Sequence, residues 1–359
     1  MSRQLGIGMV GAGEIAVRTA RGIANAPHAR HVMVMDVDAR VARDLGEAHG
    51  APHTTDVAEL LANPEVEAVY IAVPHYLHAL LALEAIRTGK HVLVEKPIAT
   101  TLEDADRMIA AAREQGVTLS VAYQAQVDPQ LRRVRELIAA PAGGHPAIGR
   151  VVGTRIVLRS DKPESYWRSG FTGRIETDWR SSKQKSGGGV LIMNTVHDLN
   201  TLRYLTGLEV TRVYAEYATF ATRVEVEDFI ALTYRYENGA IGTLEAGSAV
   251  RGRDPSREVN RIYGSEGQII LTDPPTVFVT GEVAGLKARE WQELPPIAER
   301  LDGRTAIVDG FARAVLAGEP PPVRAEDGRA ALEVIVAAYR SGEEGRPVDL
   351  PLQLAHARP

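Results

Sequence analysis

The sequence contains no cysteine. Disulfide bonds, thiolate catalysis and zinc–thiolate sites are therefore excluded, and we expect no bound metal. A run of about 20 apolar residues, the length that a membrane-spanning helix needs, is also missing. The first residues lack the charged and apolar regions of a secretory signal. We therefore expect a cytoplasmic protein that does not bind membranes.

An excess of positive charge is absent as well. The formal net charge is -5, whereas proteins that bind nucleic acid need a clustered basic face. We therefore expect a small-molecule ligand and no nucleic-acid partner. The length of 359 residues suggests two domains, because domains commonly hold about 100–200 residues.

Short apolar runs alternate with helical patterns in the first third of the chain. This alternation predicts βαβ units and a parallel sheet. The apolar runs barely alternate in polarity, which fits strands that are buried on both faces. The predicted strands are 5–10, 31–36, 68–73, 91–94 and 118–122, and the predicted helices are 14–26, 39–49, 57–61, 77–88 and 101–114.

The pattern of apolar and polar residues changes near Gln124. After this point, longer segments in which apolar and polar residues alternate are joined by tight turns. Asn238-Gly239 between two strand-like runs is a strong hairpin signal. These patterns predict a mostly antiparallel sheet with one solvated face. The segments are 149–159, 212–221 and 228–236, with a turn at 264–267 and helices at 190–205, 307–316 and 325–341.

We therefore expect an α/β protein of two domains. Residues 1–124 form a Rossmann domain with a doubly wound parallel sheet. Residues 125–359 form an α/β domain for substrate binding and oligomerisation, built on a large, open, mostly antiparallel sheet. The C-terminal helices are free to pack back on the first domain.

A glycine-rich segment follows the first predicted strand and opens the first predicted helix. Gly11, Gly13 and Ala16 fit the pattern G-x-G-x-x-A of dinucleotide-binding turns. The helix then begins at Glu14 and Ile15, where its N–H groups can meet a pyrophosphate. The alternative is a plain tight turn, but the strand–turn–helix context favours a dinucleotide.

Asp36 ends the second predicted strand, where dinucleotide-binding domains place an acidic residue that binds the ribose hydroxyls. A carboxylate there opposes a 2′-phosphate, so we expect NAD as the cofactor. Arg40 leaves NADP open, because an arginine four residues on can neutralise a phosphate. Alternatively, Asp36 and Asp38 only cap the following helix, and Arg40 lies on a solvated helix face.

Glu95-Lys96-Pro97 directly follows the buried run 91–94. The carboxyl ends of parallel strands are where doubly wound folds bind their ligands. A partly desolvated lysine has its pKa lowered and can transfer protons. Spacing alone favours a simpler interpretation, in which the Lys-Pro pair is a loop that ends the sheet.

Several motifs together resemble the Gfo/Idh/MocA family, which is named after glucose–fructose oxidoreductase, inositol dehydrogenase and a rhizopine-catabolism protein. The similarity covers essentially the whole chain. The matching segments are 8–16, 73–78, 89–97, the triple glycine 187–189 followed by His197, 328–338 and 345–348.

The resemblance implies an NAD(P)-dependent dehydrogenase or reductase that acts on CH–OH groups of sugars, inositols or related cyclic polyols. It implies that Lys96 and His197 are catalytic, and that Lys96 also contacts both cofactor and substrate. It implies further cofactor contacts at Pro74, His75, His78 and Glu95.

The chain departs from the family pattern around the histidine. Met193 stands where an aspartate is common, so an Asp–His–Lys arrangement is incomplete. Asn194, one position on, can bond a substrate hydroxyl but cannot act as a base. The other departures are Thr195, Asn200, His75 and the pair Gln126-Val127. They indicate a subgroup with different sugar recognition.

Helical spacing would place His197 on one stripe with its polar neighbours. The stripe is Met193, Asn194, His197, Asn200 and Thr201. Without the resemblance, His197 is better explained as a core residue. Between residues 161 and 185, Tyr166, Trp167 and Arg168 are candidates to bind a sugar ring, although a dimer-forming or solvated loop explains them equally.

We therefore expect hydride transfer between NAD(P) and a secondary alcohol or ketone of a sugar, inositol or related cyclic polyol. Two alternatives remain: a keto-sugar reductase working in the opposite direction, and a non-catalytic sensor of dinucleotides. We expect a homo-oligomer, either a dimer or a tetramer.

Overall fold

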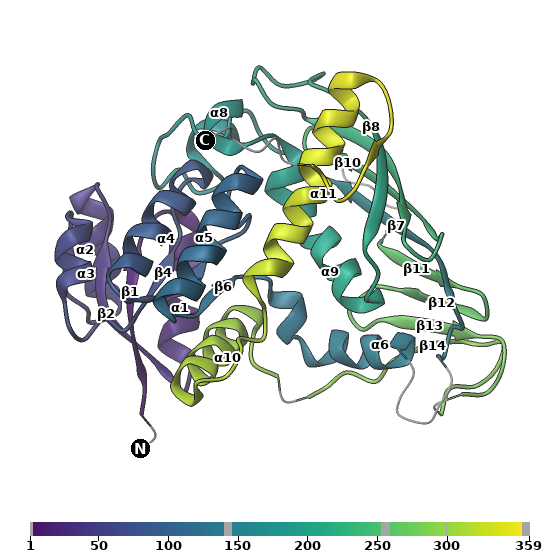
Figure 1. Ribbon diagram of the computed structural model, residues 1–359, viewed down its shortest axis with the longest axis horizontal. Coiled ribbons are helices and arrows are strands. Elements are labelled where there is room, and N and C mark those ends of the chain that lie inside the picture. The colour runs from purple at the N-terminus through teal and green to yellow at the C-terminus, as the bar shows by residue number, and fades with distance from the viewer. Residues whose placement is uncertain (1–2, 140–145, 253–258, 284, 299, 354–359) are drawn as a thin grey trace. The chain divides into compact units, whose positions relative to one another are not determined.

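The computed structural model describes residues 3–139, 146–252, 259–283, 285–298 and 300–353. Contacts divide the chain into two compact units. The first unit contains Met1–Val127, Glu164–Gly187 and Leu301–Leu332, and the second contains Asp128–Pro163, Gly188–Arg300 and Glu333–Pro359. Each unit has a sheet of its own (Figure 1).

The sheet of the first unit is parallel throughout. Its strands are β1 (Leu5–Val10), β2 (Ala29–Met35), β3 (His53–Thr54), β4 (Ala68–Ile71), β5 (His91–Val94) and β6 (Leu119–Val121). Their order is β3-β2-β1-β4-β5-β6, the order of a Rossmann sheet. The predicted parallel sheet is confirmed; only β3, two residues long, went unpredicted.

Helices connect these strands, and most begin at a side chain that caps the helix. They are α1 (Glu14–Asn25), α2 (Ala39–Ala48), α3 (Val57–Ala62), α4 (His78–Arg87) and α5 (Leu102–Gln115), with the 3₁₀ turns η1 (His75–Leu77) and η2 (Gln124–Val127). Asp38, Asp56 and Thr101 cap α2, α3 and α5. No side chain caps α1, which follows the glycine-rich turn.

Two later segments belong to the first unit. Residues 164–187, called the strap below, carry α7 (Tyr166–Ser169) and α8 (Lys183–Ser186). Helix α10 (Gly303–Ala317) packs against α1. Helix α11 (Ala325–Glu344) begins in the first unit and continues in the second. The predicted division near residue 124 stays a prediction.

The sheet of the second unit is mostly antiparallel. Its order is β14-β13-β12-β11-β7-β10-β9-β8-β15, and β7 and β10 are parallel neighbours. The strands are β7 (Val151–Arg159), β8 (Val210–Ala218), β9 (Phe229–Tyr236), β10 (Ile241–Gly247), β11 (Arg261–Gly264), β12 (Gly267–Ile270), β13 (Thr276–Val279), β14 (Trp291–Glu293) and β15 (Val348–Asp349).

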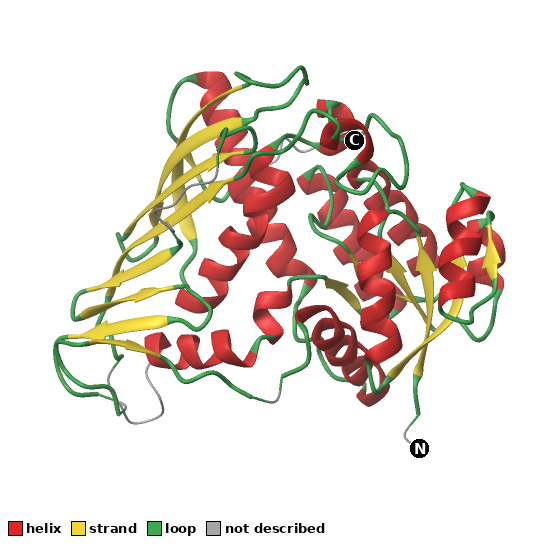
Figure 2. Cartoon of the chain, turned by 180° about the vertical axis from the view of Figure 1, so that it is seen from behind, coloured by secondary structure: helices red, strands yellow, loops and turns green. Residues whose placement is uncertain are grey.

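The predicted solvated face and hairpin of this sheet are confirmed. Exposed and buried residues alternate along β9, as expected when one face meets solvent. Asn238 and Gly239 turn the chain between β9 and β10, with Gly239 at a φ of 85°. Helices α6 (Pro129–Ala139), α9 (Val196–Thr206) and the part of α11 that belongs to the second unit lie on one side of the sheet (Figure 2).

The helix predicted over 190–205 is present, but its first part has different geometry. A π-helical turn, η3 (Leu191–Thr195), precedes α9, and the Thr195 hydroxyl donates to the Leu191 carbonyl at 2.9 Å. A π turn holds an extra residue and shifts the faces of the helix. The prediction of one stripe from Met193 to Thr201 stays a prediction: Met193 and Asn200 are buried, and Asn194 and His197 are partly exposed.

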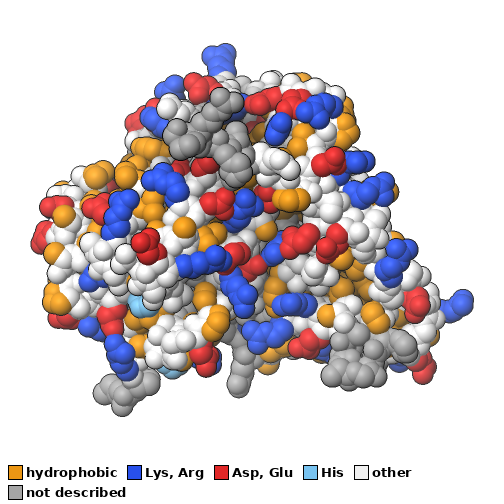
Figure 3. Space-filling view, in the orientation of Figure 1, with side chains coloured by type: hydrophobic (Ala, Val, Ile, Leu, Met, Phe, Trp, Pro, Cys, Tyr) orange, Lys and Arg blue, Asp and Glu red, His pale blue; other side chains and the backbone are white. Residues whose placement is uncertain are grey.

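On the face drawn in Figure 3, the charged side chains of the described residues form no large patch of one sign. Lys and Arg side chains are interspersed with Asp and Glu on this face (Figure 3). This agrees with the small net charge of -5. None of the helices among the described residues is both long and apolar enough to cross a membrane.

Candidate active site

The glycine-rich turn joins β1 to α1, and its first glycine is required by geometry. Gly11 has a φ of 99°, and a Cβ atom there would overlap the Ala72 carbonyl. Above Gly13 there is room, because the nearest atom to a Cβ would be Ile175 Cδ1 at 3.9 Å. Ala16 is fully buried in the helix packing. An open turn before an uncapped helix N-terminus fits a pyrophosphate.

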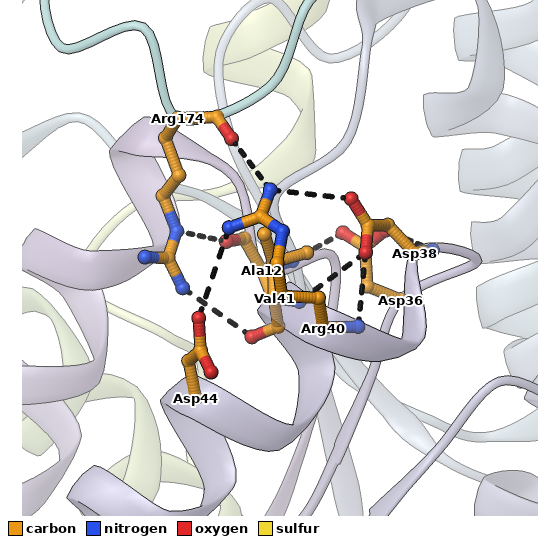
Figure 4. A network of polar contacts seen from close by, with 7 residues as sticks. All are labelled: Ala12, Asp36, Asp38, Arg40, Val41, Asp44 and Arg174. Atoms are coloured by element: carbon orange, nitrogen blue, oxygen red, sulfur yellow. Dashed lines mark hydrogen bonds and ion pairs between the residues drawn. The ribbon is translucent and has the colours of Figure 1, made fainter.

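Asp36 follows β2 and faces this turn (Figure 4). Its Oδ2 accepts a hydrogen bond from the Ala12 N–H at 2.7 Å, and its Oδ1 accepts one from the Asp38 N–H at 3.0 Å. Asp38, not Asp36, caps α2 by accepting from the N–H of Arg40 at 2.9 Å. The capping alternative therefore applies to Asp38, and Asp36 lies where a ribose-binding acid belongs.

Arg40 is exposed, and its charge already has acidic partners (Figure 4). Its guanidinium forms ion pairs with Asp38 at 3.4 Å and Asp44 at 3.8 Å. It also donates to the Arg174 carbonyl at 3.0 Å. Because these two carboxylates neutralise Arg40, its electrostatic attraction for a 2′-phosphate is weaker. This supports NAD over NADP as the cofactor.

The strap is hydrogen-bonded along the turn and the start of α1. Arg174 Nε donates to the Ala12 carbonyl at 2.8 Å, and Arg174 Nη2 donates to the Val41 carbonyl at 3.3 Å. The Glu14 carboxylate accepts from the Phe171 N–H at 3.0 Å, while the adjacent Ile15 is partly exposed. No local motif marks Arg174, so sequence reasoning missed it.

Two histidines follow β4 and Pro74. His75 is buried, its Nδ1 is 2.8 Å from the Ser186 carbonyl oxygen, and its ring lies 4.6 Å from that of Trp179. Burial, and then the charges of His78 and Lys96, hold the pKa of His75 well below its usual range. The ring is therefore neutral at pH 7.

His78 is fully buried and joins two loops. Its Nδ1 lies 2.7 Å from the Pro97 carbonyl oxygen, and its Nε2 lies 3.0 Å from that of Val73. Both loops follow strands at the same edge of the sheet. Its surroundings support a positioning role, and the predicted cofactor contacts of Pro74, His75 and His78 stay predictions.

Lys96 lies at the carboxyl end of β5, next to the buried carboxylate of Glu95. Desolvation by burial lowers the pKa of Lys96; Glu95 raises it, and the charges of Arg304 and Arg180 lower it further. The net direction is downward. A lysine with a lowered pKa exchanges protons more readily near neutral pH, which is the property predicted for this residue.

The triple glycine in front of η3 is held by a buried carboxylate in the second unit. Glu227 accepts hydrogen bonds from the N–H groups of Gly189 at 2.6 Å and Leu191 at 2.9 Å, and from the Tyr339 hydroxyl at 2.9 Å. A Cβ on Gly188 would overlap Tyr339, and one on Gly189 would overlap the Glu227 backbone. Glu227 therefore fixes the start of the helix that carries His197.

Asn194 and His197 lie on this helix in the second unit. The Nζ of Lys162, a residue only 2% exposed, donates to Asn194 Oδ1 at 2.6 Å. Met193 is buried and offers no carboxylate. The acidic neighbour of His197, Asp198, instead accepts from Asn260 Nδ2 at 2.6 Å. Sequence reasoning missed Lys162, because nothing local marks it as buried.

The candidate sugar-binding residues of the strap differ in exposure. Tyr166 and Trp167 are buried, and Arg168 is exposed. The Arg180 guanidinium lies 5.3 Å from the Tyr166 ring and 4.7 Å from the Trp179 ring. Substrate contacts of these strap residues remain predictions.

A Rossmann sheet with a glycine-rich turn and an acidic residue after its second strand defines an NAD-binding protein. Two family descriptions match the chain: "Oxidoreductase family, NAD-binding Rossmann fold" over residues 5–123, and "GFO/IDH/MocA C-terminal domain" over residues 131–270. The chain therefore belongs to the Gfo/Idh/MocA family of oxidoreductases. The predicted family, fold class, cofactor and enzyme class are confirmed.

Two relatives and one solved structure match this chain over nearly their whole length. The 1,5-anhydro-D-fructose reductase of Ensifer adhaerens is 30% identical over 345 residues, which are 96% of this chain and 98% of that one. The myo-inositol 2-dehydrogenase of Thermotoga maritima is 28% identical over 353 residues, with 96% and 98% covered. The WlbA dehydrogenase from Bordetella pertussis, solved with NADH and UDP-GlcNAcA, is 26% identical with a TM-score of 0.79, covering 98% of this chain and 100% of that chain.

Proposed function

We propose that this oxidoreductase transfers a hydride between NAD and a secondary alcohol carbon of a sugar, inositol or related cyclic polyol. The observation that carries the proposal is Lys96: it lies at the carboxyl end of a Rossmann strand, and its pKa is lowered by burial. Named relatives that act on an anhydrosugar and on an inositol support the substrate class.

The residues of the first unit fit the cofactor. The uncapped N-terminus of α1 and the space above Gly13 suit the pyrophosphate, and Asp36 suits the ribose hydroxyls. When bound, NAD supplies a nicotinamide ring that accepts the hydride. Gly11, Gly13, Glu14, Ile15 and Asp36 would hold the cofactor, and Arg40 lies beside them.

The chain's own part in the reaction is to handle the hydroxyl proton. As the substrate carbon gives up its C–H electron pair as hydride, the hydroxyl must lose a proton to a base. We assign this work to Lys96 and His197, with Asn194 bonding a neighbouring hydroxyl. A lysine whose pKa is lowered has a larger neutral fraction near pH 7, and only the neutral amine accepts a proton.

A screen for NADH formation tests this function. Purified protein with NAD would be offered inositols, aldoses, anhydrosugars and sugar acids, and absorbance at the NADH band would be followed. We expect one of these groups to be oxidised, with little turnover of NADP. The reverse screen offers keto-sugars and NADH, and activity only in that direction identifies a reductase. NADH binding without turnover of any polyol or keto-sugar would favour a sensor.

We also propose a homo-oligomer in the cytoplasm. The outer face of the second unit's sheet exposes Tyr214 and Ile241, at 37% and 50% of their surfaces, and would be the face that a second copy covers. Light scattering of the purified protein distinguishes a monomer from a dimer or tetramer. Fractionation of cells tests the location.

A further inference from the structure

Glu95 directly precedes the candidate catalytic lysine, and its carboxylate has two partners of its own. Glu95 is 5% exposed. The Tyr70 hydroxyl donates to its Oε1 at 2.8 Å, and the Arg304 guanidinium lies 3.5 Å from the same oxygen. A buried carboxylate is stable when it is paired with a cation and hydrogen-bonded. Tyr70 and Arg304 supply both.

Arg304 comes from the first turn of α10, far along the chain from Glu95. Asp302 caps this helix and accepts a hydrogen bond from the Arg304 N–H at 3.1 Å. Helix α10 lies close to α1 at Gly22, where a Cβ would come within 3.0 Å of the Arg304 carbonyl carbon. The Arg304 guanidinium also reaches the Thr19 hydroxyl of α1 at 3.5 Å. The cap and the close helix packing therefore aim Arg304 at Glu95.

The charges around Lys96 give this pair a consequence for proton transfer. Glu95 stabilises the ammonium form of Lys96, whereas Arg304 and Arg180 destabilise it. His75 is buried nearby, and burial holds its pKa well below its usual range, so it adds little positive charge at neutral pH. If Arg304 were absent, Arg180 would be the remaining one of these two charges to oppose the effect of Glu95 on Lys96.

We propose that Arg304 is a positioning residue for Lys96: its pairing with Glu95 fixes the Glu95-Lys96-Pro97 turn and keeps Lys96 able to give up its proton. The importance of the Arg304–Glu95 pair for catalysis rests on the proposed function. The effect of the pair on the titration of Lys96 is independent of that function. Arg304 does not touch the reacting atoms and acts through Glu95.

Two substitutions should move the titration of Lys96 in opposite directions. In Arg304→Gln the pKa of Lys96 should rise, because Glu95 loses its cation and the positive charge of Arg304 is gone. In Glu95→Gln the pKa of Lys96 should fall, because the ammonium loses its anion. Arg304→Lys keeps the charge and should leave the titration close to that of the wild type. A role in stability alone would not produce opposite shifts.

Competitive labelling with a trace of acetic anhydride measures this titration without enzyme activity. The acetylation of each lysine is followed against pH by peptide mass spectrometry, with exposed Lys287 as the internal reference. The matched control is Arg329→Gln, which removes an arginine that pairs with Asp106 at 2.8 Å in the same unit. Thermal melting of each variant shows whether it is folded.

Opposite shifts for Arg304→Gln and Glu95→Gln, with none for Arg329→Gln, support the inference. If Arg304→Gln fails to fold, Glu95→Gln and Arg304→Lys still test the inference. An unchanged pKa of Lys96 in Glu95→Gln overturns the inference, and so does an unchanged pKa of Lys96 in folded Arg304→Gln. Should the wild type oxidise no polyol while the shifts appear, the proposed function fails and the positioning of Lys96 stands.

Discussion

Asp36 binds the backbone of the glycine-rich turn directly, through the 2.7 Å hydrogen bond that its Oδ2 accepts from the Ala12 N–H. The same carboxylate that shapes the turn therefore lies beside the place where a ribose would bind. This dual position connects the conformation of the turn to the choice between NAD and NADP.

Asp36→Ala should weaken NAD binding about tenfold or more, because hydrogen bonds to a charged group contribute about 1.5–3 kcal/mol. The variant should also discriminate less against NADP, because it lacks the carboxylate that repels a 2′-phosphate. Isothermal titration with both cofactors measures this. Asp38→Asn is the matched control, because asparagine also caps a helix. Equal affinity of the wild type for NADP would contradict the assignment and promote Arg40 to a phosphate ligand.

Gly189→Ala should lower the free energy of unfolding by roughly 2–3 kcal/mol, as expected for an overpacked site. The new Cβ would overlap the Glu227 backbone, and the hydrogen bonds of Glu227 to Gly189 and Leu191 prevent the chain from moving away. Urea denaturation provides the measurement. Gly281→Ala is the control, because a Cβ there meets open space. Similar stabilities of the two variants would show that the triple glycine is not needed for packing.

The stability of the protein should depend on the ionisation of Asp198. Burial raises the pKa of this carboxyl to about 6, although the hydrogen bond from Asn260 opposes the shift. The folded state then binds the proton more tightly than the unfolded state, in which the pKa is about 3.9. The contribution of Asp198 to the free energy of unfolding therefore falls as pH rises from about 4 to 6 and stays low above that.

Asp198→Asn should remove this loss and stabilise the protein at pH 8 by about 1–2 kcal/mol, a value reduced from the full shift because Asp198 is partly exposed. At pH 4 the variant should match the wild type. Urea denaturation at both pH values compares them, with the exposed Asp349→Asn as the control. A gain that is the same at both pH values would contradict a raised pKa.

His197→Asn should lower turnover by about 10²-fold or more, because asparagine cannot accept the hydroxyl proton. Met193→Asp should change the pH optimum or the substrate preference and keep the fold, as measured by kcat/KM against pH and by circular dichroism. Met193 is buried, so Met193→Leu is needed to separate packing from charge. A wild-type profile for His197→Asn would make the histidine a core residue.

Local signals in the sequence were enough to predict the parallel sheet of the first unit, apart from β3, and the helices that connect its strands. The glycine-rich turn, Asp36 and the Glu95-Lys96-Pro97 turn each depend on a few adjacent residues and on a strand before them. Buried parallel strands and capped helices leave the same kind of local pattern. Their boundaries were therefore predicted to within a few residues.

Features made by distant residues could not be predicted in this way. Arg174 reaches the glycine-rich turn from the strap, Arg304 reaches Glu95 from α10, and Lys162 is buried beside Asn194. Each contact depends on packing between segments far apart in the chain. The π turn before His197 could not be predicted from the sequence either, because a helical turn with an extra residue has no distinctive composition.

The most direct test of the account is the Lys96→Met variant, measured for both turnover and cofactor binding. Turnover should fall by about 10²–10⁴-fold, the usual range for a lost acid–base group, while NAD affinity changes little, because the turn at Gly11 and Asp36 is untouched. Lys90→Met is the control: the Lys90 amine donates to the Asn63 carbonyl at 3.3 Å, and this variant should keep full activity. A Lys96→Met enzyme with wild-type turnover would contradict the central claim that Lys96 handles the substrate proton.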